Sequence, residues 1–537
     1  MTKFIIITGG VVSSIGKGIT TASIGRLLKH YNYNVGAVKI DPYLNYDSGT
    51  LNPYQHGEVF VTYDGMETDL DIGHYERFLD IELTGDSNIT TGKIYKNIID
   101  KEREGGYLGE CVQVVPHVTD TVKEHLFKVA DEGNYDVVMV ELGGTVGDIE
   151  SEAYLEALRQ LRNELPCCDT FFIHTVYVPY LEAAKEYKTK PTQHSVQTLR
   201  GKGINPDMLI VRSKKDLDNE LLEKISKRCG VNRNAVISLS NMEDIYYIPH
   251  YLSNYNVEEV LGEKLGLELS KTVDDGWFKP KKIVSYDGTV KIGIVGKYTE
   301  YEDSYISIRE ALQHAAENLN IDLEIKYVNS EYYSDNQLYD VDGVLVPGGF
   351  GARGIQGKLD SIRYCRVNDV PCFGICLGMQ LMVVDFARDH GMFGANSSEF
   401  NPQTEYSVIN LMGSQRKIQT LGGTMRLGNY HCRIIEDTLA SESYMEDDVY
   451  ERHRHRYEFN NDYKKTLTQK GLVISGLNPK TELAEIIEDP KLTYYLGCQF
   501  HPEYKSRPNN PHPLFTSFIH ASYQKKEEEE EKTDVKK

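Results

Sequence analysis

The stretch that decides the fold reads Phe4-Ile-Ile-Ile-Thr-Gly-Gly-Val-Val-Ser-Ser-Ile-Gly-Lys-Gly-Ile-Thr20. A short β-branched run ends in glycines, and residues 20–30, which follow, are typical of a helix. Further apolar runs at 34–40, 136–141 and 207–212 alternate with helix-like segments. Strands that are apolar along their whole length and alternate with helices indicate a parallel sheet covered on both faces. The first half of the chain is therefore predicted to be a doubly wound α/β domain.

A second domain of the same class is expected further along the chain. At roughly 100–200 residues per domain, 537 residues suggest two to four domains. The polar stretch 267–289 interrupts the strand–helix alternation, which then resumes. We therefore expect an α/β fold with two doubly wound domains, over 1–266 and 290–524, joined by a linker. Residues 525–537 contain five consecutive glutamates and are predicted to be a disordered charged tail.

Composition excludes several classes of protein. Lys and Arg number 59 against 80 Asp and Glu, a net charge of −21, which argues against a nucleic-acid surface because such a surface needs a basic field. A nucleotide pocket stays possible, since it needs only a few local cations. The nine cysteines are odd in number and irregularly spaced, as in proteins of a reducing compartment. No apolar run reaches about 18 residues, so we expect no membrane partner and a cytoplasmic location.

The glycine-rich segment 8–20 has the features of a phosphate-binding loop. Its glycines let backbone N–H groups turn toward an anion, and the following helix adds its positive N-terminal end. Lys17 can supply a mobile charge for β- and γ-phosphates. The loop departs from the consensus GxxxxGK[ST], because Val11 stands at the first glycine and Gly18 at the Ser/Thr. Taken alone, it also fits a glycine-rich turn with an incidental lysine.

Two carboxylates and a basic segment accompany this loop. Glu141 ends a predicted strand, and the carboxyl ends of parallel strands form the ligand edge of such a sheet. With Asp71 it could hold Mg²⁺, which needs few protein ligands, although either acid alone also fits a solvated surface charge. Lys39 ends the second strand, and residues 188–193 (KTKPTQ) carry two more cations. These cations could neutralise a second polyphosphate or form an exposed basic turn.

A nucleophile motif stands in the second half of the chain. Gly374-Ile-Cys376-Leu-Gly378 follows an apolar strand and precedes a helix-like segment, the pattern of a sharp strand-to-helix turn that projects a nucleophile. The helix N-terminus favours the thiolate, which needs a base and an orienting group. His501 and Glu503 lie two positions apart after another strand, so they face the same side of an extended segment. Singly, Cys376 also fits a buried structural thiol and His501 a core histidine.

Two further features belong to this half of the chain. The backbone N–H groups of Leu377 and of Gly349, in a glycine turn, are candidates for an oxyanion hole, worth about 2.7–4 kcal/mol each in the transition state. The run Arg452-His-Arg-His-Arg456 places two histidines among arginines, which repel a metal cation. We expect it to bind a substrate carboxylate or another anion.

Ten motifs occur in a fixed order along residues 1–522. They are GGVVSSIGKG, KIDPY, QHGEVF, GGTVGDIE, KTKPTQHS, PGGFG, GICLGMQ, LGGTMRLG, RHRHRYE and QFHPE. This set resembles the CTP synthase family, glutamine-dependent amidotransferases that make CTP from UTP. The resemblance implies an N-terminal P-loop-like nucleotide-binding amidoligase domain and a C-terminal class I glutamine amidotransferase domain. The unusual phosphate loop is similar to the family's own version.

The resemblance also implies two coupled reactions. A thiolate at Cys376 attacks the glutamine amide, ammonia leaves and a thioester is hydrolysed, with His501 as acid and base and Glu503 orienting it. ATP phosphorylates O4 of UTP, and ammonia displaces the phosphate. The family further uses GTP as an activator, CTP as a feedback inhibitor and a homotetramer. Arg353 and Gly354 are our expected GTP contacts.

The site residues implied by the resemblance fall into four groups. The ATP-binding positions are Ser14, Ile15, Gly16, Lys17, Gly18, Ile19 and Asp71. The Mg²⁺ ligands are Asp71 and Glu141. The UTP- and CTP-binding positions are Ser13, Asp148, Ile149, Glu150, Lys188, Thr189, Lys190, Pro191, Thr192, Gln193 and Lys224. The glutamine-binding positions are Gly349, Leu377, Gly378, Met379, Gln380, Glu399 and Arg456.

Two other interpretations fit part of the pattern. An amidotransferase that forms GMP would share the Cys…His…Glu half, but KTKPTQHS and GGTVGDIE speak against it. A nucleotide-gated scaffold with vestigial sites would not need the complete set Lys17, Asp71, Glu141, Cys376, His501 and Glu503.

Overall fold

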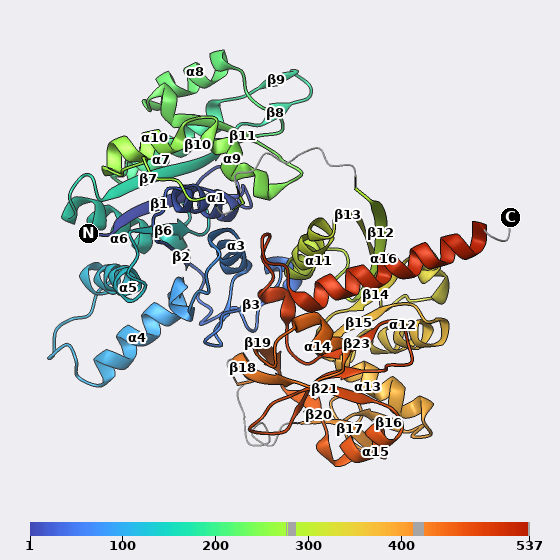
Figure 1. The fold of residues 1–537 in the computed structure, drawn as a ribbon. Helices are drawn as coiled ribbons and strands as arrows, with labels where there is room; N and C mark the ends of the chain where they lie inside the picture. The colour runs from blue at the N-terminus through green and yellow to red at the C-terminus, as the bar shows by residue number, and fades with distance from the viewer. Residues whose placement is uncertain (275, 278–285, 412–423, 535–537) are drawn as a thin grey trace. The chain divides into compact units, whose positions relative to one another are not determined.

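The computed structural model describes residues 1–274, 276–277, 286–411 and 424–534. The chain forms two compact units (Figure 1). The first contains Met1–Ser48 and Asp71–Pro280, and the second contains Gly49–Leu70 and Lys281–Lys537. Of the helices in the described residues, none combines the length and apolarity needed to span a membrane. Part of the predicted linker, 278–285, lies outside the described residues.

The first unit is built on a seven-stranded sheet in the order β11-β10-β7-β1-β6-β2-β5. Every neighbouring pair is parallel, as the continuous apolar runs predict. The strands are β1 (Lys3–Gly9), β2 (Val35–Asp41), β5 (Asn88–Thr90), β6 (Val137–Leu142), β7 (Thr170–Tyr177), β10 (Met208–Ser213) and β11 (Val236–Ser240).

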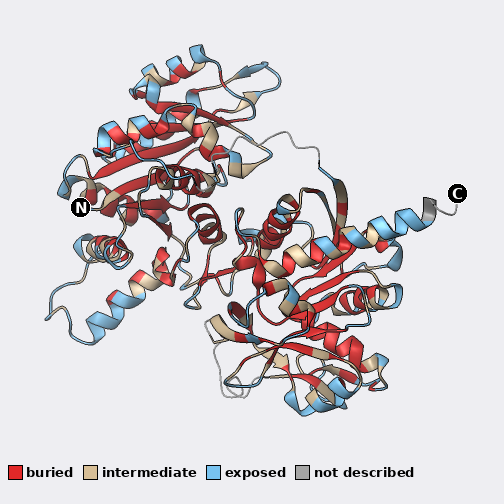
Figure 2. Ribbon diagram, viewed as in Figure 1, coloured by how far each residue is buried: buried red, intermediate tan, exposed pale blue. Residues whose placement is uncertain are grey.

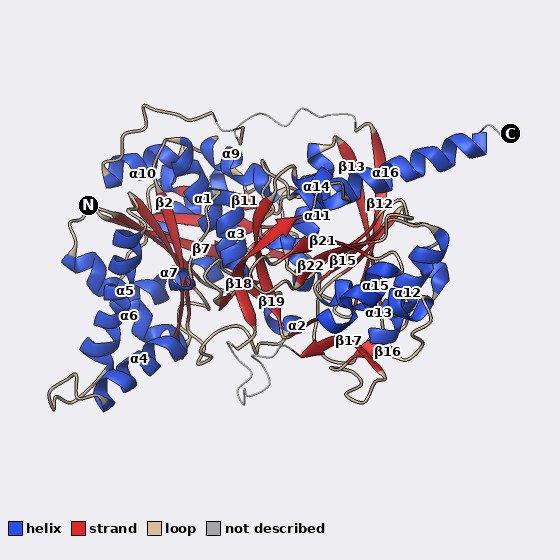
Figure 3. Cartoon of the chain, turned by 60° about the horizontal axis from the view of Figure 1, so that its bottom comes forward, coloured by secondary structure: helices blue, strands red, loops and turns tan. Residues whose placement is uncertain are grey.

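Helices pack on both faces of this sheet. Phe4 and Ile6 of β1 join one core with Leu126 and Leu158, so the alternate residues of β1 face the opposite side, where the first helix packs. Buried strands and half-buried helices alternate accordingly (Figures 2 and 3). The helices are α1 (Lys17–His30), α3 (Leu70–Leu79), α4 (Thr91–Arg103), α5 (Thr119–Glu132), α6 (Glu152–Glu164), α7 (Lys190–Gly201), α8 (Asn219–Cys229), α9 (Ile248–Ser253) and α10 (Val257–Leu265).

The second unit has a nine-stranded mixed sheet in the order β13-β12-β14-β15-β23-β22-β21-β18-β19. The first five strands are parallel, and the remaining four extend the sheet antiparallel. The strands are β12 (Gly288–Gly296), β13 (Ile321–Asn329), β14 (Gly343–Val346), β15 (Cys372–Ile375), β18 (Arg426–Ile434), β19 (Asp448–His455), β21 (Val473–Leu477), β22 (Ala484–Glu488) and β23 (Tyr495–Cys498). A smaller sheet joins β16 (Ala395–Ser397), β17 (Tyr406–Leu411) and β20 (Tyr457–Phe459).

Two cores cover the two faces of the larger sheet. One contains Ile362 and Val383 from helices α12 (Ile355–Asn368) and α13 (Leu377–Asp389). The other contains Leu312 and Phe518 from α11 (Ile306–Asn318) and α16 (Pro513–Asp534). The expectation of α/β domains wound on both faces is confirmed, and the antiparallel strands are an addition to it. The remaining helices are α14 (Leu439–Tyr444) and α15 (Lys464–Gln469).

Residues 49–70 group with the second unit although they lie early in the chain. They form α2 (Pro53–His56), β3 (Phe60–Val61) and β4 (Glu67–Thr68). Glu58 accepts a hydrogen bond from the backbone N–H of Ser307 at 3.0 Å, and Tyr504 donates to the carbonyl of Val59 at 3.0 Å. The expected continuous domain 1–266 therefore differs from the observed grouping by this excursion.

The C-terminal segment is helical where the sequence predicts disorder. Helix α16 continues to Asp534, and only 535–537 lie outside the described residues. Lys525 pairs with Asp369 at 2.7 Å, and Lys526 donates to the carbonyl of Thr289 at 2.7 Å. These contacts extend a packed helix into a run of good helix formers, so the structure differs from the predicted tail over 525–534.

Candidate functional site

Cys376 lies at the sharp turn between β15 and α13 in the second unit. Its backbone is left-handed, with φ 53° and ψ −103°, a strained conformation that is also found where a strand-to-helix turn carries a nucleophile. The Cys376 N–H donates to the carbonyl of Cys498 at 2.7 Å, which anchors the turn to β23. A Cβ on Gly378 would lie 2.0 Å from the Val346 carbonyl oxygen, so only glycine lets α13 begin so close to β14.

His501 and Glu503 form the predicted pair beside this thiol. His501 Nδ1 lies 2.7 Å from Glu503 Oε1, and both side chains are buried. Burial opposes the imidazolium, but the Glu503 carboxylate and Cys376 together raise the pKa of His501 to about 10. Within the described residues, His501 Nε2 is buried and has no hydrogen bond of normal geometry. A ring oriented through Nδ1 with Nε2 open is the arrangement that a general acid and base needs.

A cavity of about 190 Å³ opens at these residues. Its walls come from the glycine turn 347–350, from His501 and Glu503, and from the excursion 49–70, all within the second unit. The lining residues are Gly49, Leu51, Pro53, Glu58, Val59, Tyr298, Ser304, Tyr305, Ile308, Pro347, Gly348, Gly349, Phe350, Cys376, Arg454, His501, Glu503 and Tyr504. The cavity therefore brings the Cys376 thiol, the His501 imidazole and a backbone turn together.

The other predicted glutamine contacts lie around Cys376. Leu377 and Met379 lie on the first turn of α13, as does Gln380, which donates to the carbonyl of Tyr457 at 2.8 Å. Glu399 accepts a hydrogen bond from the Gly351 N–H at 3.0 Å, and burial raises the pKa of its carboxyl. Arg456 acts electrostatically on Glu399, so the structure brings these two predicted residues together.

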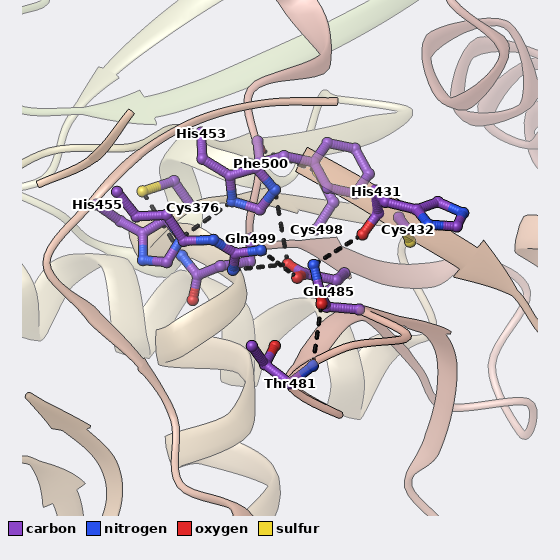
Figure 4. Close-up of polar contacts among 12 residues, drawn as sticks. Cys376, His431, Cys432, His453, His455, Thr481, Glu485, Cys498, Gln499 and Phe500 are labelled. Carbon is purple, nitrogen blue, oxygen red and sulfur yellow. Dashed lines mark hydrogen bonds and ion pairs between the residues drawn. The ribbon is translucent and has the colours of Figure 1, made fainter. Parts of the chain in front are cut away.

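A buried polar network behind Cys376 has no counterpart in the sequence-based expectations (Figure 4). Gln499 Nε2 lies 3.8 Å from Cys376 Sγ. Nearby, His453 Nδ1 lies 3.0 Å from His455 Nε2, and His453 Nε2 lies 3.6 Å from Glu485. Burial holds the pKa of both histidines well below the usual value, so both are neutral. The anion site expected in the 452–456 run is thus not built by its histidines, which are inward-facing core groups.

The predicted phosphate loop lies between β1 and α1 of the first unit. Gly16 caps α1 in a left-handed conformation, with φ 83°. Lys17 begins the helix and folds back over Gly9, where a Cβ would lie 2.6 Å from Lys17 Cδ. Its ammonium donates to the carbonyl of Gly144 at 2.7 Å. Burial lowers the pKa of Lys17, because the buried ammonium loses its hydration.

Asp71 and Glu141 converge on one lysine beside this loop. The Lys39 ammonium lies 2.9 Å from Glu141 and forms an ion pair with Asp71 as well. A Cβ on Gly18 would lie 1.9 Å from Asp71 Oδ1, so only glycine fits at that position. Burial, with the charge of Asp71, raises the pKa of Glu141, and Lys39 draws the pKa of Asp71 down despite burial.

The two carboxylates Asp71 and Glu141 are oxygen donors of the kind that Mg²⁺ prefers. The described residues contain no group of three or more His, Cys, Asp or Glu side chains arranged for a metal. Two hard carboxylates beside a phosphate loop are sufficient for Mg²⁺, because this ion keeps waters and takes its other ligands from phosphates. Asp71 and Glu141 are the residues that would hold it.

The predicted pyrimidine-nucleotide residues lie on three segments of the first unit. Ser13 belongs to the loop, and Asp148 accepts from the Thr145 N–H at 2.8 Å while Ile149 and Glu150 are exposed. Residues 188–193 lead into and begin α7. Lys188 pairs with Glu186, whose carboxyl pKa is lowered by Lys188 and by Lys224. Lys224 of α8 is therefore close to the basic segment.

His174 explains why α7 lies against the loop. Its ring bridges Thr8 Oγ1 and Ser195 Oγ, each at 2.8 Å. Burial and the charge of Lys17 lower the pKa of His174 to about 3, so a neutral ring makes both bonds. A Cβ on Gly10 would lie 1.6 Å from Ser195 Oγ. The only sequence signal for this bridge was a histidine inside a buried strand.

Comparison with known proteins finds relatives that match almost the whole chain. Residues 3–267 match the family model described as CTP synthase N-terminus, and residues 300–521 match glutamine amidotransferase class-I. The chain is 54% identical to the CTP synthase of Methanothermobacter thermautotrophicus over 528 residues, covering 98% of this chain and 99% of that protein. It is 53% identical to the CTP synthase of Methanosphaera stadtmanae over 531 residues, which cover 98% of this chain and 99% of that protein.

Among solved structures, the Trypanosoma brucei CTPS glutaminase domain with bound acivicin is 36% identical. That match covers 44% of this chain and 94% of the other, with a TM-score of 0.42. The full-length identities, together with two family models that follow one another along the sequence, decide the assignment. The chain belongs to the CTP synthase family.

Proposed function

We propose that this protein catalyses the ATP-dependent amination of UTP to CTP with ammonia taken from glutamine. The observation that carries the proposal is the pairing, in one chain, of the Cys376–His501–Glu503 site with the loop around Lys17. One site releases ammonia, and the other activates a carbonyl oxygen as a phosphate ester. Neither half is sufficient, because C4 of the uracil ring has no leaving group until its oxygen is phosphorylated.

In the second unit, the thiolate of Cys376 attacks the glutamine side-chain amide. His501 gives a proton to the departing ammonia and later takes one from the water that hydrolyses the thioester, while Glu503 holds the ring. The N–H groups of Leu377 and Gly349 stabilise the oxyanion. Gly378, Met379, Gln380, Glu399 and Arg456 complete the glutamine pocket.

In the first unit, Ser14–Ile19 and Asp71 bind ATP, and the backbone N–H groups and Lys17 hold its phosphates. Mg²⁺, held by Asp71 and Glu141, would neutralise phosphate charge when bound. Ser13, residues 148–150, residues 188–193 and Lys224 bind the uridine nucleotide and, by the same contacts, the product CTP as inhibitor.

GTP activation, a homotetramer and a cytoplasmic location are further parts of the proposal. Arg353 lies over the rings of Tyr54 and Tyr298, with 5.8 and 5.6 Å to the ring centres, and pairs with Glu331 at 3.1 Å. A half-exposed cation on aromatic rings suits a purine nucleotide, and Gly354 follows it at the start of α12.

The cysteines are all free, which suits a reducing compartment. Light scattering with and without nucleotides tests the tetramer.

The test is a split activity. CTP formation from UTP and ATP is measured with glutamine or with ammonia as nitrogen donor. Cys376→Ala should abolish the glutamine-driven reaction and leave the ammonia-driven one, and Lys17→Ala should abolish both. Cys111→Ala, at an exposed thiol, is the matched control and should match the wild type. A wild-type protein that makes no CTP from ammonia would contradict the proposal.

A further inference from the structure

Lys358 of α12 is a buried lysine directly behind the glycine turn 347–350. Its side chain is 1% exposed, and its ammonium donates to the carbonyl oxygens of Pro347 at 2.6 Å and Gly348 at 3.4 Å. In the part of the chain that the structure describes, no carboxylate lies within ion-pair distance of it. Burying a charge without a counter-ion lowers the stability of the folded protein. We therefore expect Lys358 to have a role beyond packing.

The hydrogen bond to the Gly348 carbonyl orients the peptide plane between Gly348 and Gly349, and the bond to the Pro347 carbonyl orients the plane before it. In a trans peptide the C=O and the following N–H point in opposite directions. With the Gly348 carbonyl bound to Lys358 on the buried side, the Gly349 N–H points the other way. The turn lines the cavity together with Cys376, so a Gly349 N–H that points away from Lys358 can face that cavity.

The turn itself is close to the reacting groups. A Cβ on Gly348 would lie 3.0 Å from His501 Cε1 and 3.5 Å from Cys376 Cβ. Lys297 holds the same turn further along, through the carbonyl of Phe350. Two lysines therefore bind three carbonyls of one four-residue turn, and a rotated peptide would put a carbonyl where the N–H donor is needed.

Lys358 also interacts electrostatically with the Cys376 thiol. Burial, with help from Lys297, lowers the pKa of Lys358 to about 7, whereas Cys376 raises it. The ammonium and Cys376 are thus near enough to interact. Negative charge that develops at Cys376 during the reaction favours the charged form of Lys358 and so strengthens its hold on the turn.

We propose that Lys358 is a positioning residue of the glutaminase site, which binds the carbonyls of Pro347 and Gly348 and thereby directs the Gly349 N–H at the oxyanion. The proposal rests on the proposed role of Cys376 as the nucleophile. It assigns to Lys358 an effect on the oxyanion transition state that exceeds its electrostatic effect on the thiol, and no effect on glutamine binding.

The test compares Lys358→Met, which keeps the length and loses the charge and donors, with the wild type in the full-length protein. The kcat for glutamine hydrolysis should fall about 10²- to 10³-fold, the usual effect of losing an oxyanion donor, with an unchanged KM. Alkylation of Cys376 by iodoacetamide should slow much less than hydrolysis, because displacement at a saturated carbon forms no oxyanion and depends only on the charge that Lys358 exerts on the thiol. Ammonia-driven CTP formation should also be unchanged, which shows that the protein is folded.

Ile362→Val, on the same helix and fully buried, is the matched control for packing and should keep its glutaminase activity. Lys358→Gln keeps an N–H donor on a shorter side chain and should recover part of the lost kcat. It also serves as the test variant if Lys358→Met does not fold. An unchanged kcat in these variants, or an equal loss of hydrolysis and alkylation, would overturn the proposal. Failure of the proposed function is seen separately, as glutaminase activity that survives Cys376→Ala.

Discussion

His501 Nδ1 and Glu503 Oε1 are 2.7 Å apart in a buried pair, two residues from each other just after β23. The Glu503 carboxylate changes the pKa of the His501 ring. It raises the pKa of the imidazole to about 10 against the effect of burial. At neutral pH the pair therefore keeps a protonated ring beside Cys376, and a protonated ring next to a cysteine favours the thiolate.

Glu503→Gln tests this relationship. The amide cannot stabilise the imidazolium, so the pKa of His501 should fall toward its ordinary value and glutamine hydrolysis should slow by about 10²- to 10⁴-fold. The alkaline limb of the pH–rate profile should move to lower pH, because the His501 ring now loses its proton at lower pH and the proton that it gives to the departing ammonia is then missing. The ammonia-driven reaction serves as control and should be unaffected. A slowed enzyme with an unshifted profile would mean that Glu503 acts through geometry alone.

Two glycines should separate the two reactions. In Gly18→Ala the new methyl group would meet Asp71 Oδ1 at 1.9 Å, and in Gly378→Ala it would meet the Val346 carbonyl at 2.0 Å. We expect the first variant to lose CTP formation with either nitrogen donor while it keeps glutamine hydrolysis. The second should lose hydrolysis and keep the ammonia-driven reaction. Gly201→Ala, with no atom within 4 Å of its Cβ, is the control, and identical losses in Gly18→Ala and Gly378→Ala would refute the assignment.

Much of this arrangement could be predicted from local sequence. The strand–glycine–helix pattern around Lys17 and the Gly-x-Cys-x-Gly turn around Cys376 define their own geometry, because each motif is one strand end and one helix start. His501 and Glu503 were predictable as a pair for the same reason, since two positions apart on an extended segment share a side.

Contacts between distant segments were not predictable in this way. Nothing in residues 49–70 marks them as part of the second unit, because their partners, such as Ser307 and Tyr504, lie about 250 to 450 positions away. The role of Lys358 depends on a carbonyl turn 10 residues earlier that only the fold brings over its ammonium. The helix at 525–534 depends on Asp369 in the same way.

Lys39 should be essential to the first unit. Lys39→Met would leave Asp71 and Glu141 facing each other in a buried site without their shared cation. Breaking a buried pair in this way costs about 3–5 kcal/mol, and CTP formation should be lost with both nitrogen donors. Denaturant unfolding measures the first effect. Lys96→Met, in an exposed ion pair on α4, should change stability by less than about 1 kcal/mol, and a similarly small change for Lys39→Met would show that the two carboxylates do not depend on it.

Glu458 should make the second unit more stable at acid than at alkaline pH. Burial raises the pKa of its carboxyl to about 7 from the ordinary 4.5, although Arg426 opposes the shift. A folded-state pKa above the unfolded value means that the folded form holds its proton to higher pH. Stability is then lost as pH rises from 4.5 through 7, by at most about 3 kcal/mol.

Glu458→Gln removes this titration. Its midpoint of thermal unfolding should exceed that of the wild type at a pH of about 8.5, and the difference should shrink at about 5.5, where the native carboxyl is protonated. Glu436→Gln, at an exposed position, should show no such pH-dependent gain. A gain for Glu458→Gln that is equal at both pH values would mean that the substitution acts through packing. A loss at alkaline pH would mean instead that the ionised carboxylate stabilises the fold by pairing with Arg426.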